Sequence, residues 1–234
     1  MRLQTGIRGF DKLVSGGLLE NRLYILSGPP GSGKTTFSAQ FATHNAKDGK
    51  NCLFLSMHES EAELRSDMAN FDFDIDTAFE SGRLQFLNIF DSPVKRMLGN
   101  NGNSDHNSSV KNLINKLIGF VNSQDVDILI IDSTMVLNYY FPEKEGGMIQ
   151  FLTSLKNANV TTLLISEMTD PTSYTEEQYL AHGVVFLHNY LEPTGMTRGV
   201  QILKMRGMDI DCDICKVDFS QQGLSVFPME TVQV

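Results

Sequence analysis

The sequence predicts an α/β domain with a doubly wound, mainly parallel central sheet flanked by helices, followed by an antiparallel C-terminal extension. Five apolar runs alternate with polar segments of helical periodicity, at residues 22–28, 51–57, 83–90, 126–134 and 160–168. After residue 183 this alternation stops, and strand-like runs follow one another through turn-rich connections. The length of 234 residues suits one sizeable core, so we expect a single domain over residues 1–234.

The first five strands are predicted by their continuous apolar character. Runs such as RLYILSG, NCLFLSM and VDILIIDST are rich in Ile, Leu, Val and Phe without regular polar positions between them. That pattern is typical of strands covered on both faces, as in a parallel sheet between two layers of helices. The later runs GVVFLHNY and GVQILKMRG are joined by the turn-rich EPTGMTRG, which predicts an antiparallel pairing.

The segments between strands carry helical patterns or loop-forming residues. In residues 108–124, apolar side chains recur with the spacing of an amphipathic helix, at Val110, Leu113, Ile114, Leu117 and Val121. A helix is also expected over residues 36–47. Residues 91–109 and 168–182 are expected to form surface loops. The second loop begins at a strand end, where such sheets bind ligands, and is either a substrate contact or a simple connector.

A phosphate-binding loop is the strongest functional signal. The stretch GPPGSGKT, from Gly28 to Thr35, matches G-x-x-x-x-G-K-[ST] and lies between a predicted strand and a predicted helix. Glycines let backbone N–H groups close around phosphate oxygens, and the helix N-terminus adds a favourable dipole. Lys34 is expected to reach the β- and γ-phosphates, and the Thr35 hydroxyl to bind Mg²⁺. The residues expected to bind the nucleotide are Gly28, Pro30, Gly31, Ser32, Gly33, Lys34, Thr35 and Thr36.

An acidic residue at the end of a later strand supplies the second part of such a site. Asp132 ends the run ILIID, where a carboxylate can hold Mg²⁺ or its bound water. A buried aspartate at a strand end can instead cap the next helix. Because the phosphate-binding loop is present, we favour the metal role and expect Thr35 and Asp132 to bind the magnesium ion.

Motifs along the whole chain resemble the KaiC-like ATPases of the RecA/RadA superfamily. The segment before the phosphate-binding loop matches the opening of that family at Thr5, Gly6, Gly9, Phe10, Asp11, Leu13, Gly16, Gly17 and Leu18. The likeness continues through IIDS (130–133), LLISE (163–167), GVVFL (183–187), KMRG (204–207) and GLSVFP. It covers the chain as one stand-alone domain, of the sort common in archaea, whereas the circadian-clock protein has two in tandem.

The resemblance implies a RecA-like P-loop fold that binds ATP with Mg²⁺ and assembles into a hexameric ring, with ATP at the subunit interfaces. In that family, the element that matches KMRG reaches the nucleotide of the neighbouring subunit. By that resemblance, Lys204 and Arg206 would act in trans on the γ-phosphate, as an arginine finger does. A solvated cationic edge strand would show the same pair of residues on one strand face.

The sequence departs from the family at the end of the run 51–57. The family usually has two consecutive glutamates there, the first being assigned to the attacking water, whereas this chain has His58 and Glu59. Three outcomes are open: Glu59 is the base, His58 accepts the proton itself, or hydrolysis is very slow. We expect slow turnover, with a catalytic set of Glu59, His58, Lys34, Lys204 and Arg206.

Two further positions bear on the γ-phosphate and on autophosphorylation. Ser166 and Glu167 follow the run TTLLI, where the superfamily places residues that sense the γ-phosphate, although Ser166 could equally cap a loop. The clock protein phosphorylates a neighbouring Ser and Thr just before the strand matching GVVFL, where this chain has QYLAH (178–182). We therefore do not expect it to share that autokinase activity. The family's histidine shortly after KMRG is also missing here.

Composition narrows the function classes. The net charge of −9 disfavours general affinity for nucleic acid or anionic membranes, and no apolar run is long enough for a transmembrane helix. The N-terminus lacks the apolar region of a signal peptide, and three cysteines without a framework favour a reducing, cytoplasmic setting.

Three functions follow from these observations. The first is a Mg²⁺-dependent, slow ATPase acting as an oligomeric signalling or regulatory switch, with protein partners that the sequence does not identify. The second is a DNA-binding recombination mediator similar to RadA. It would need basic residues in the polar loops, but 91–109 offers only Lys95 and Arg96, and 168–182 offers none. The third is a module that binds ATP without turnover.

Overall fold

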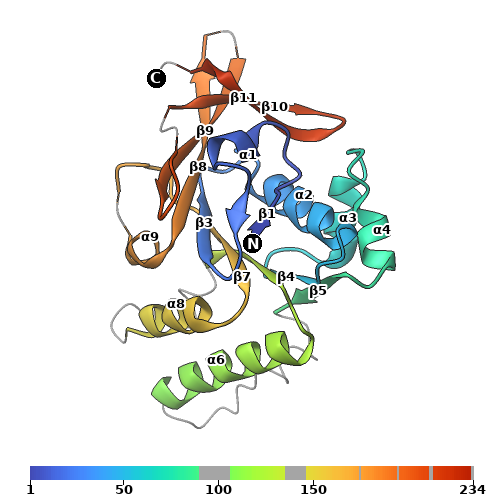
Figure 1. Ribbon diagram of the computed structural model, residues 1–234, viewed down its shortest axis with the longest axis vertical. Coiled ribbons are helices and arrows are strands. Elements are labelled where there is room, and N and C mark those ends of the chain that lie inside the picture. The colour runs from blue at the N-terminus through green and yellow to red at the C-terminus, as the bar shows by residue number, and fades with distance from the viewer. Residues whose placement is uncertain (90–105, 135–145, 174, 194, 211–212, 233–234) are drawn as a thin grey trace.

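Nine strands form one mixed sheet (Figure 1). The computed structural model describes residues 1–89, 106–134, 146–173, 175–193, 195–210 and 213–232, with the backbone alone for 106–113 and 192. Most of the predicted loop 91–109 thus lies outside the described residues. In sheet order the strands are β11 (Gly223–Thr231), β10 (Cys215–Ser220), β9 (Gly195–Met205), β8 (Gly183–Glu192), β3 (Leu23–Ser27), β7 (Thr161–Ser166), β6 (Ile128–Asp132), β4 (Cys52–Ser56) and β5 (Leu84–Asn88).

Strand directions confirm the predicted fold class. The six strands from β8 to β5 in the sheet order run parallel to one another, and β9, β10 and β11 extend the sheet by antiparallel pairing. β8 belongs to both parts, because it is parallel to β3 and antiparallel to β9. The antiparallel part therefore begins at the β8–β9 pair rather than at residue 183. A second, two-stranded sheet pairs β1 (Arg2–Leu3) with β2 (Leu18–Leu19).

Helices cover both faces of the nine-stranded sheet (Figure 1). One face carries α1 (Phe10–Leu13), α2 (Lys34–Lys47), α3 (Glu61–Met68) and α4 (Ile75–Glu80), and the other carries α6 (His106–Ser123), α8 (Gly147–Asn157) and α9 (Glu176–Leu180). The helices predicted over 36–47 and 108–124 are confirmed as α2 and α6, with Ile114, Leu117 and Val121 buried. Within the described ranges, no helix has both the length and the apolarity needed to cross a bilayer.

Capping boxes mark where two of the helices begin. The Ser60 side chain accepts from the Glu63 backbone amide before α3, and the Glu63 carboxylate accepts from the Ser60 amide in return. Thr175 and Gln178 form the same arrangement before α9. The segment 168–182, predicted as a loop, therefore contains a short helix whose T-x-x-Q start is visible in the sequence.

The parallel strands bring four segments to one edge of the sheet. Their carboxyl ends share a direction, and the strand pairing places Ser56 beside Asp132 and Ser27 beside Ser166. The residues that follow β3, β4, β6 and β7 therefore meet at this edge. Open α/β sheets bind their ligands at such an edge.

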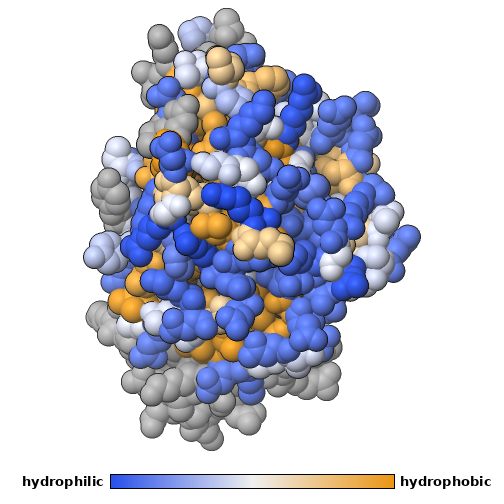
Figure 2. All heavy atoms as spheres, viewed as in Figure 1, coloured by the Kyte–Doolittle hydropathy of each residue, from blue (hydrophilic) through white to orange (hydrophobic). Residues whose placement is uncertain are grey.

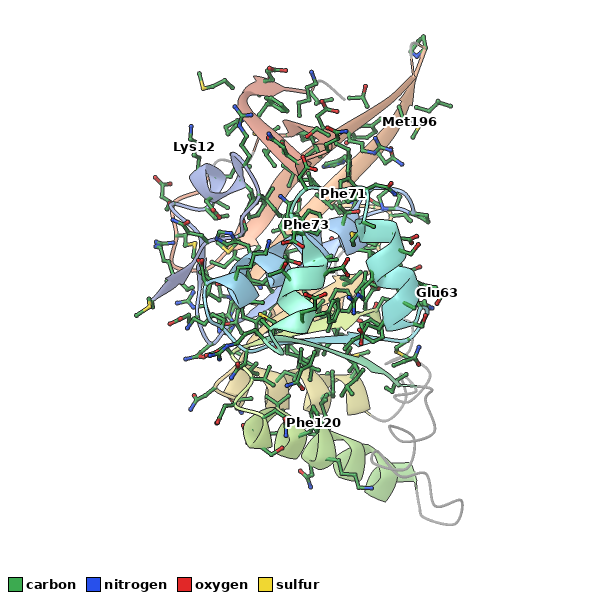
Figure 3. The ribbon with its side chains drawn as sticks, turned by 90° about the vertical axis from the view of Figure 1, so that its right-hand side faces the viewer. Lys12, Glu63, Phe71, Phe73, Phe120 and Met196 are labelled. Carbon is green, nitrogen blue, oxygen red and sulfur yellow. The ribbon has the colours of Figure 1, made fainter. Side chains whose placement is uncertain are left out.

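The connection between α3 and α4 packs against the C-terminal strands. The Asp72 amide donates to the Gln221 carbonyl at 2.6 Å, and the stacked rings of Phe71 and Phe73 pack against the core. Figure 3 shows both rings near the C-terminal strands, with Glu63 on the outer side of α3. Hydrophilic side chains dominate the surface over these helices (Figure 2). The C-terminal strands are thereby fixed beside α2 and the loop that precedes it.

Candidate functional site

The loop from Gly28 to Thr35 connects β3 to α2 in a conformation that only glycine allows at key points. Gly28, Gly31 and Gly33 have φ angles of 148°, 75° and 98°. A Cβ atom at Gly28 would lie 2.3 Å from the carbonyl oxygen of Leu187, and one at Gly33 would lie 2.3 Å from the Phe219 ring. Glycine at these positions therefore lets the loop keep the conformation in which backbone amides can close around a phosphate.

A cleft of about 350 Å³ opens in front of this loop. It is lined by Pro30, Gly31, Gly33, Lys34, Thr35, Thr36, His58, Glu59, Asp132 and Glu167. Six of the eight predicted loop residues, both predicted metal-binding residues and both candidate bases thus share one concave surface. Gly28 and Ser32 belong to the same loop but do not line the cleft. The Ser32 hydroxyl is buried and has no hydrogen-bond partner among the described residues.

Lys34 folds back onto the loop that precedes it. Its Nζ donates to the carbonyl of Gly28 at 2.8 Å and to that of Pro29 at 3.1 Å. Burial lowers the pKa of Lys34, while the negative charges of Glu167 and Asp132 oppose that shift. The ammonium group is therefore placed at the phosphate-binding loop, and a phosphate oxygen could replace the two carbonyls as its partner.

Thr35 and Asp132 form the polar pair expected to bind a metal ion. The Thr35 hydroxyl donates to Oδ2 of Asp132 at 3.1 Å, and Asp132 is only 7% exposed. Burial raises the pKa of Asp132, and the Thr35 hydrogen bond and the charges of His58 and Lys34 counteract the rise. One carboxylate and one hydroxyl at a phosphate-binding loop fit Mg²⁺, which takes few protein ligands and fills its shell with phosphate oxygens and water.

Both candidate bases reach the cleft from the turn after β4. Nε2 of the exposed His58 lies 3.4 Å from the Ser133 hydroxyl. Glu59 is less exposed, and burial raises its pKa to about 7, with further contributions from the charges of Asp132, Asp67 and Glu63. Glu59 thus has the properties of a carboxylate that exchanges a proton near neutral pH.

At the end of β7, the structure brings Glu167 rather than Ser166 into the cleft. Ser166 is 9% exposed and its side chain is not part of the cleft lining, whereas Glu167 is exposed and lines it. Successive residues of a strand point to opposite faces, which explains why only one of the two faces the phosphate-binding loop.

Lys204 and Arg206 do not reach the cleft of their own chain. They lie at the end of β9, which pairs with the first residues of β8, near the amino end of β3. The phosphate-binding loop follows the carboxyl end of β3, a five-residue strand that spans roughly 16 Å at about 3.3 Å per residue. Both cations donate to the carbonyl of Tyr179 at the end of α9, Lys204 at 2.9 Å and Arg206 at 3.1 Å. They share one side of the chain, as predicted.

Three residues of the antiparallel strands contact the phosphate-binding loop without having been predicted. Nδ2 of Asn189 donates to the Pro30 carbonyl and Nε of Arg198 to the Gly31 carbonyl, each at 3.4 Å. The Arg198 guanidinium also lies 4.9 Å from the centre of the Phe219 ring. Sequence spacing gives no signal for these residues, because their contacts arise only when the C-terminal strands fold beside β3.

Comparisons with known proteins agree with this architecture. The chain matches the family model described as "ATPase: KaiC" over residues 3–231. It is 29% identical to the circadian clock oscillator protein KaiC of Parathermosynechococcus lividus, over 99% of this chain and 43% of that protein. It is 25% identical to UPF0273 protein PH0284 of Pyrococcus horikoshii, over 97% of this chain and 94% of that one.

A solved structure extends the similarity to three dimensions. The KaiC-like protein PH0186 of Pyrococcus horikoshii superposes with a TM-score of 0.81 and 28% identity, covering 97% of this chain and 99% of that one. The chain spans about half the length of the curated clock proteins that it matches, from 43% to 47% in the first two. The α/β architecture with its antiparallel extension is therefore the RecA-like fold of KaiC-like proteins, and the chain belongs to the KaiC family of ATPases.

Proposed function

We propose that this protein is a Mg²⁺-dependent ATPase that hydrolyses the γ-phosphate slowly and acts as a ring-forming regulatory switch. The convergence of Lys34, Thr35, Asp132 and Glu59 on one cleft carries this proposal. These side chains supply a cation for phosphate, an oxygen pair for a metal ion and a carboxylate for proton transfer, which are the parts that phosphoryl transfer to water needs.

The nucleotide phosphates are held by the loop from Gly28 to Thr36. Lys34 exchanges its carbonyl partners for phosphate oxygens, and Thr35 and Asp132 hold Mg²⁺, which when bound offsets charge on the β- and γ-phosphates. The buried Ser32 hydroxyl, which has no hydrogen-bond partner among the described residues, supports a ligand at this loop.

Glu59 is the general base in this proposal. A bond forms between the water oxygen and the γ-phosphorus as the bond to the leaving ADP oxygen breaks, and the water proton passes to the Glu59 carboxylate. A base works best when its pKa lies near the working pH, and the pKa of Glu59 is raised to about 7. His58, hydrogen-bonded to Ser133, helps to orient the water rather than accepting its proton.

The active site is completed by a second copy of the chain. Lys204 and Arg206 lie roughly a strand length from the phosphate-binding loop of their own chain, so they can neutralise a γ-phosphate only in a neighbour. Heterologous contacts of this kind close into a ring, which we propose to be a hexamer. Because both cations hold α9 in the isolated chain, reaching a neighbour's phosphate also releases that helix, which links nucleotide state to conformation.

Steady-state hydrolysis of ATP with Mg²⁺ tests this proposal. Wild-type protein is compared with Lys34→Ala, Glu59→Gln and His58→Ala, with the oligomer mass measured in parallel. We expect turnover in wild type, loss to background in the first two variants and partial activity in the third. ATP binding by wild type without turnover above the Lys34→Ala background would contradict the enzyme proposal and leave a nucleotide-binding module.

A further inference from the structure

A cluster of positive charge surrounds His182 at the amino ends of β3 and β8. The Arg206 amide donates to the His182 carbonyl at 2.8 Å, and Nη1 of Arg22 donates to the Arg206 carbonyl at 2.6 Å. Lys204 and Arg206 both donate to the carbonyl of Tyr179 in α9. Lys156, near the end of α8, completes the set of cations whose fields act on His182.

This cluster lacks acidic partners in the described part of the chain. None of Arg22, Lys156, Lys204 and Arg206 forms a salt bridge with a described carboxylate, although the protein as a whole has a net charge of −9. Burial lowers the pKa of His182, and the four cations lower it further. Such uncompensated positive charge favours an anion as its missing partner.

Backbone hydrogen bonds fix the orientation of the His182 ring. Its Nδ1 accepts from the Leu23 amide at 3.1 Å, and its own amide donates to the Leu23 carbonyl at 2.8 Å. In the neutral ring the proton must then be on Nε2, because Nδ1 acts as an acceptor. His182 is partly exposed, and its Nε2 makes no hydrogen bond to a described residue, so it can donate to a group from outside the chain.

We propose that Nε2–H of His182 binds the phosphates of the nucleotide held by a neighbouring copy, as a third group beside Lys204 and Arg206. This inference rests on the proposed trans-acting site. It assigns a role to the imidazole of the residue just before β8, whose carbonyl accepts from the Arg206 amide although the two residues are 24 positions apart in the sequence. A neutral N–H donor within reach of the charges of Lys204 and Arg206 binds phosphate oxygens without adding a further repelling charge to the cluster.

Two substitutions separate this role from a purely structural one. In His182→Asn, the side-chain oxygen can replace Nδ1 as the acceptor for Leu23, but the Nε2–H donor is lost. In His182→Gln, the longer amide can replace the Nε2–H donor, and the acceptor is lost. We expect kcat/KM for ATP to fall about tenfold in His182→Asn and about threefold or less in His182→Gln, at unchanged oligomer mass. The reverse order would show that His182 only supports the strand, and would overturn the inference.

Mixing experiments separate failure of this inference from failure of the proposed site. Lys34→Ala protein keeps its trans-acting cations, so it should restore activity to both His182→Asn and Arg206→Ala in mixed rings. Rescue of Arg206→Ala without rescue of His182→Asn would overturn the role of His182 and leave the trans-acting site intact. Rescue of neither variant would contradict the trans-acting site itself.

Chemical modification of the unaltered protein covers the case in which both variants misfold. Diethylpyrocarbonate acylates an imidazole nitrogen that carries a free lone pair, so His182 reacts slowly, when the Leu23 amide–Nδ1 bond opens and the proton moves from Nε2 to Nδ1, and the modified residue can be identified by mass spectrometry. In rings of equal mass, ADP with Mg²⁺ and aluminium fluoride should slow modification of His182 at least fivefold, and should have no effect in Lys34→Ala rings. Equal rates with and without nucleotide would overturn the inference.

Discussion

At the scale of residues, burial and neighbouring charges act differently on the pKa values of the carboxylates in the cleft. Burial raises the pKa of Asp132, but the Thr35 hydrogen bond and the positive charges of His58 and Lys34 counteract that rise. The Glu59 carboxylate has no such hydrogen bond to a described residue, and burial together with the charges of nearby carboxylates raises its pKa to about 7. In the function that we propose, Asp132 and Glu59 thereby take different tasks, metal binding and proton transfer.

The raised pKa of Glu59 predicts the pH dependence of turnover. The base must be ionised, so kcat at saturating ATP should rise nearly tenfold per pH unit below about 7 and level off above it. Steady-state rates of ATP hydrolysis at saturating ATP and Mg²⁺, measured from pH 5.5 to 9, give this profile. His58→Ala should keep the same midpoint. A midpoint that is lost in His58→Ala would assign the base to His58, and a flat profile in wild type would contradict Glu59 as the general base.

The same shift predicts a stability effect that does not depend on catalysis. An acid with a folded-state pKa above its ordinary value of 4.5 destabilises the fold once it is ionised, so the cost is absent below about 4.5 and complete above about 7. Glu59→Gln should therefore raise the melting temperature at pH 8 and leave it unchanged at pH 4.5. Thermal unfolding at the two pH values tests this, and an equal change at both would contradict a pKa-based cause.

Removing the Asp132 carboxylate tests the metal site. Asp132→Asn keeps the size of the side chain and an acceptor for Thr35, but loses the negative charge that favours Mg²⁺. We expect the Mg²⁺ concentration for half-maximal activity to rise at least tenfold, with nucleotide binding in the absence of metal little changed. Unaltered Mg²⁺ dependence would show that Asp132 serves as a structural residue.

At the scale of elements, the parallel strands and the phosphate-binding loop could be predicted because their signals are local. Apolar runs identified β3 to β7, and the glycine pattern placed the loop before α2. The contacts of Asn189, Arg198 and Phe219 with that loop could not be predicted, since they depend on how the antiparallel strands pack beside β3. The helix α9 was missed because its five residues are too few for an apolar period, although its capping box is local.

The capping box of α9 offers a way to test how far Lys204 and Arg206 hold this helix in place. Thr175→Ala removes the side chain that accepts from the Gln178 amide, which should destabilise this short helix by about 1 kcal/mol. Amide hydrogen exchange in residues 176–181 should quicken severalfold, with the amides of α2 as an internal control. Unchanged exchange would mean that packing against α8 and the cations alone hold α9.

At the scale of the whole molecule, we propose that the chain carries two halves of a site, at opposite ends of β3. The phosphate-binding loop and the base lie at the carboxyl edge of the sheet, and the cationic cluster around His182 lies at the amino end of β3 and β8. We propose that the phosphate-binding loop of one copy meets the cationic cluster of a neighbouring copy.

Subunit mixing tests that claim most directly. Lys34→Ala and Arg206→Ala proteins are each expected to be nearly inactive alone. Mixed in equal amounts and allowed to exchange, they should regain up to about a quarter of wild-type activity, because about one interface in four then pairs an intact loop with intact cations. A Lys216→Ala protein, changed at a surface ion pair with Glu230, is the control and should be active alone. If mixed rings form, as shown by mass, and activity stays at the level of the separate variants, the two halves do not meet between subunits.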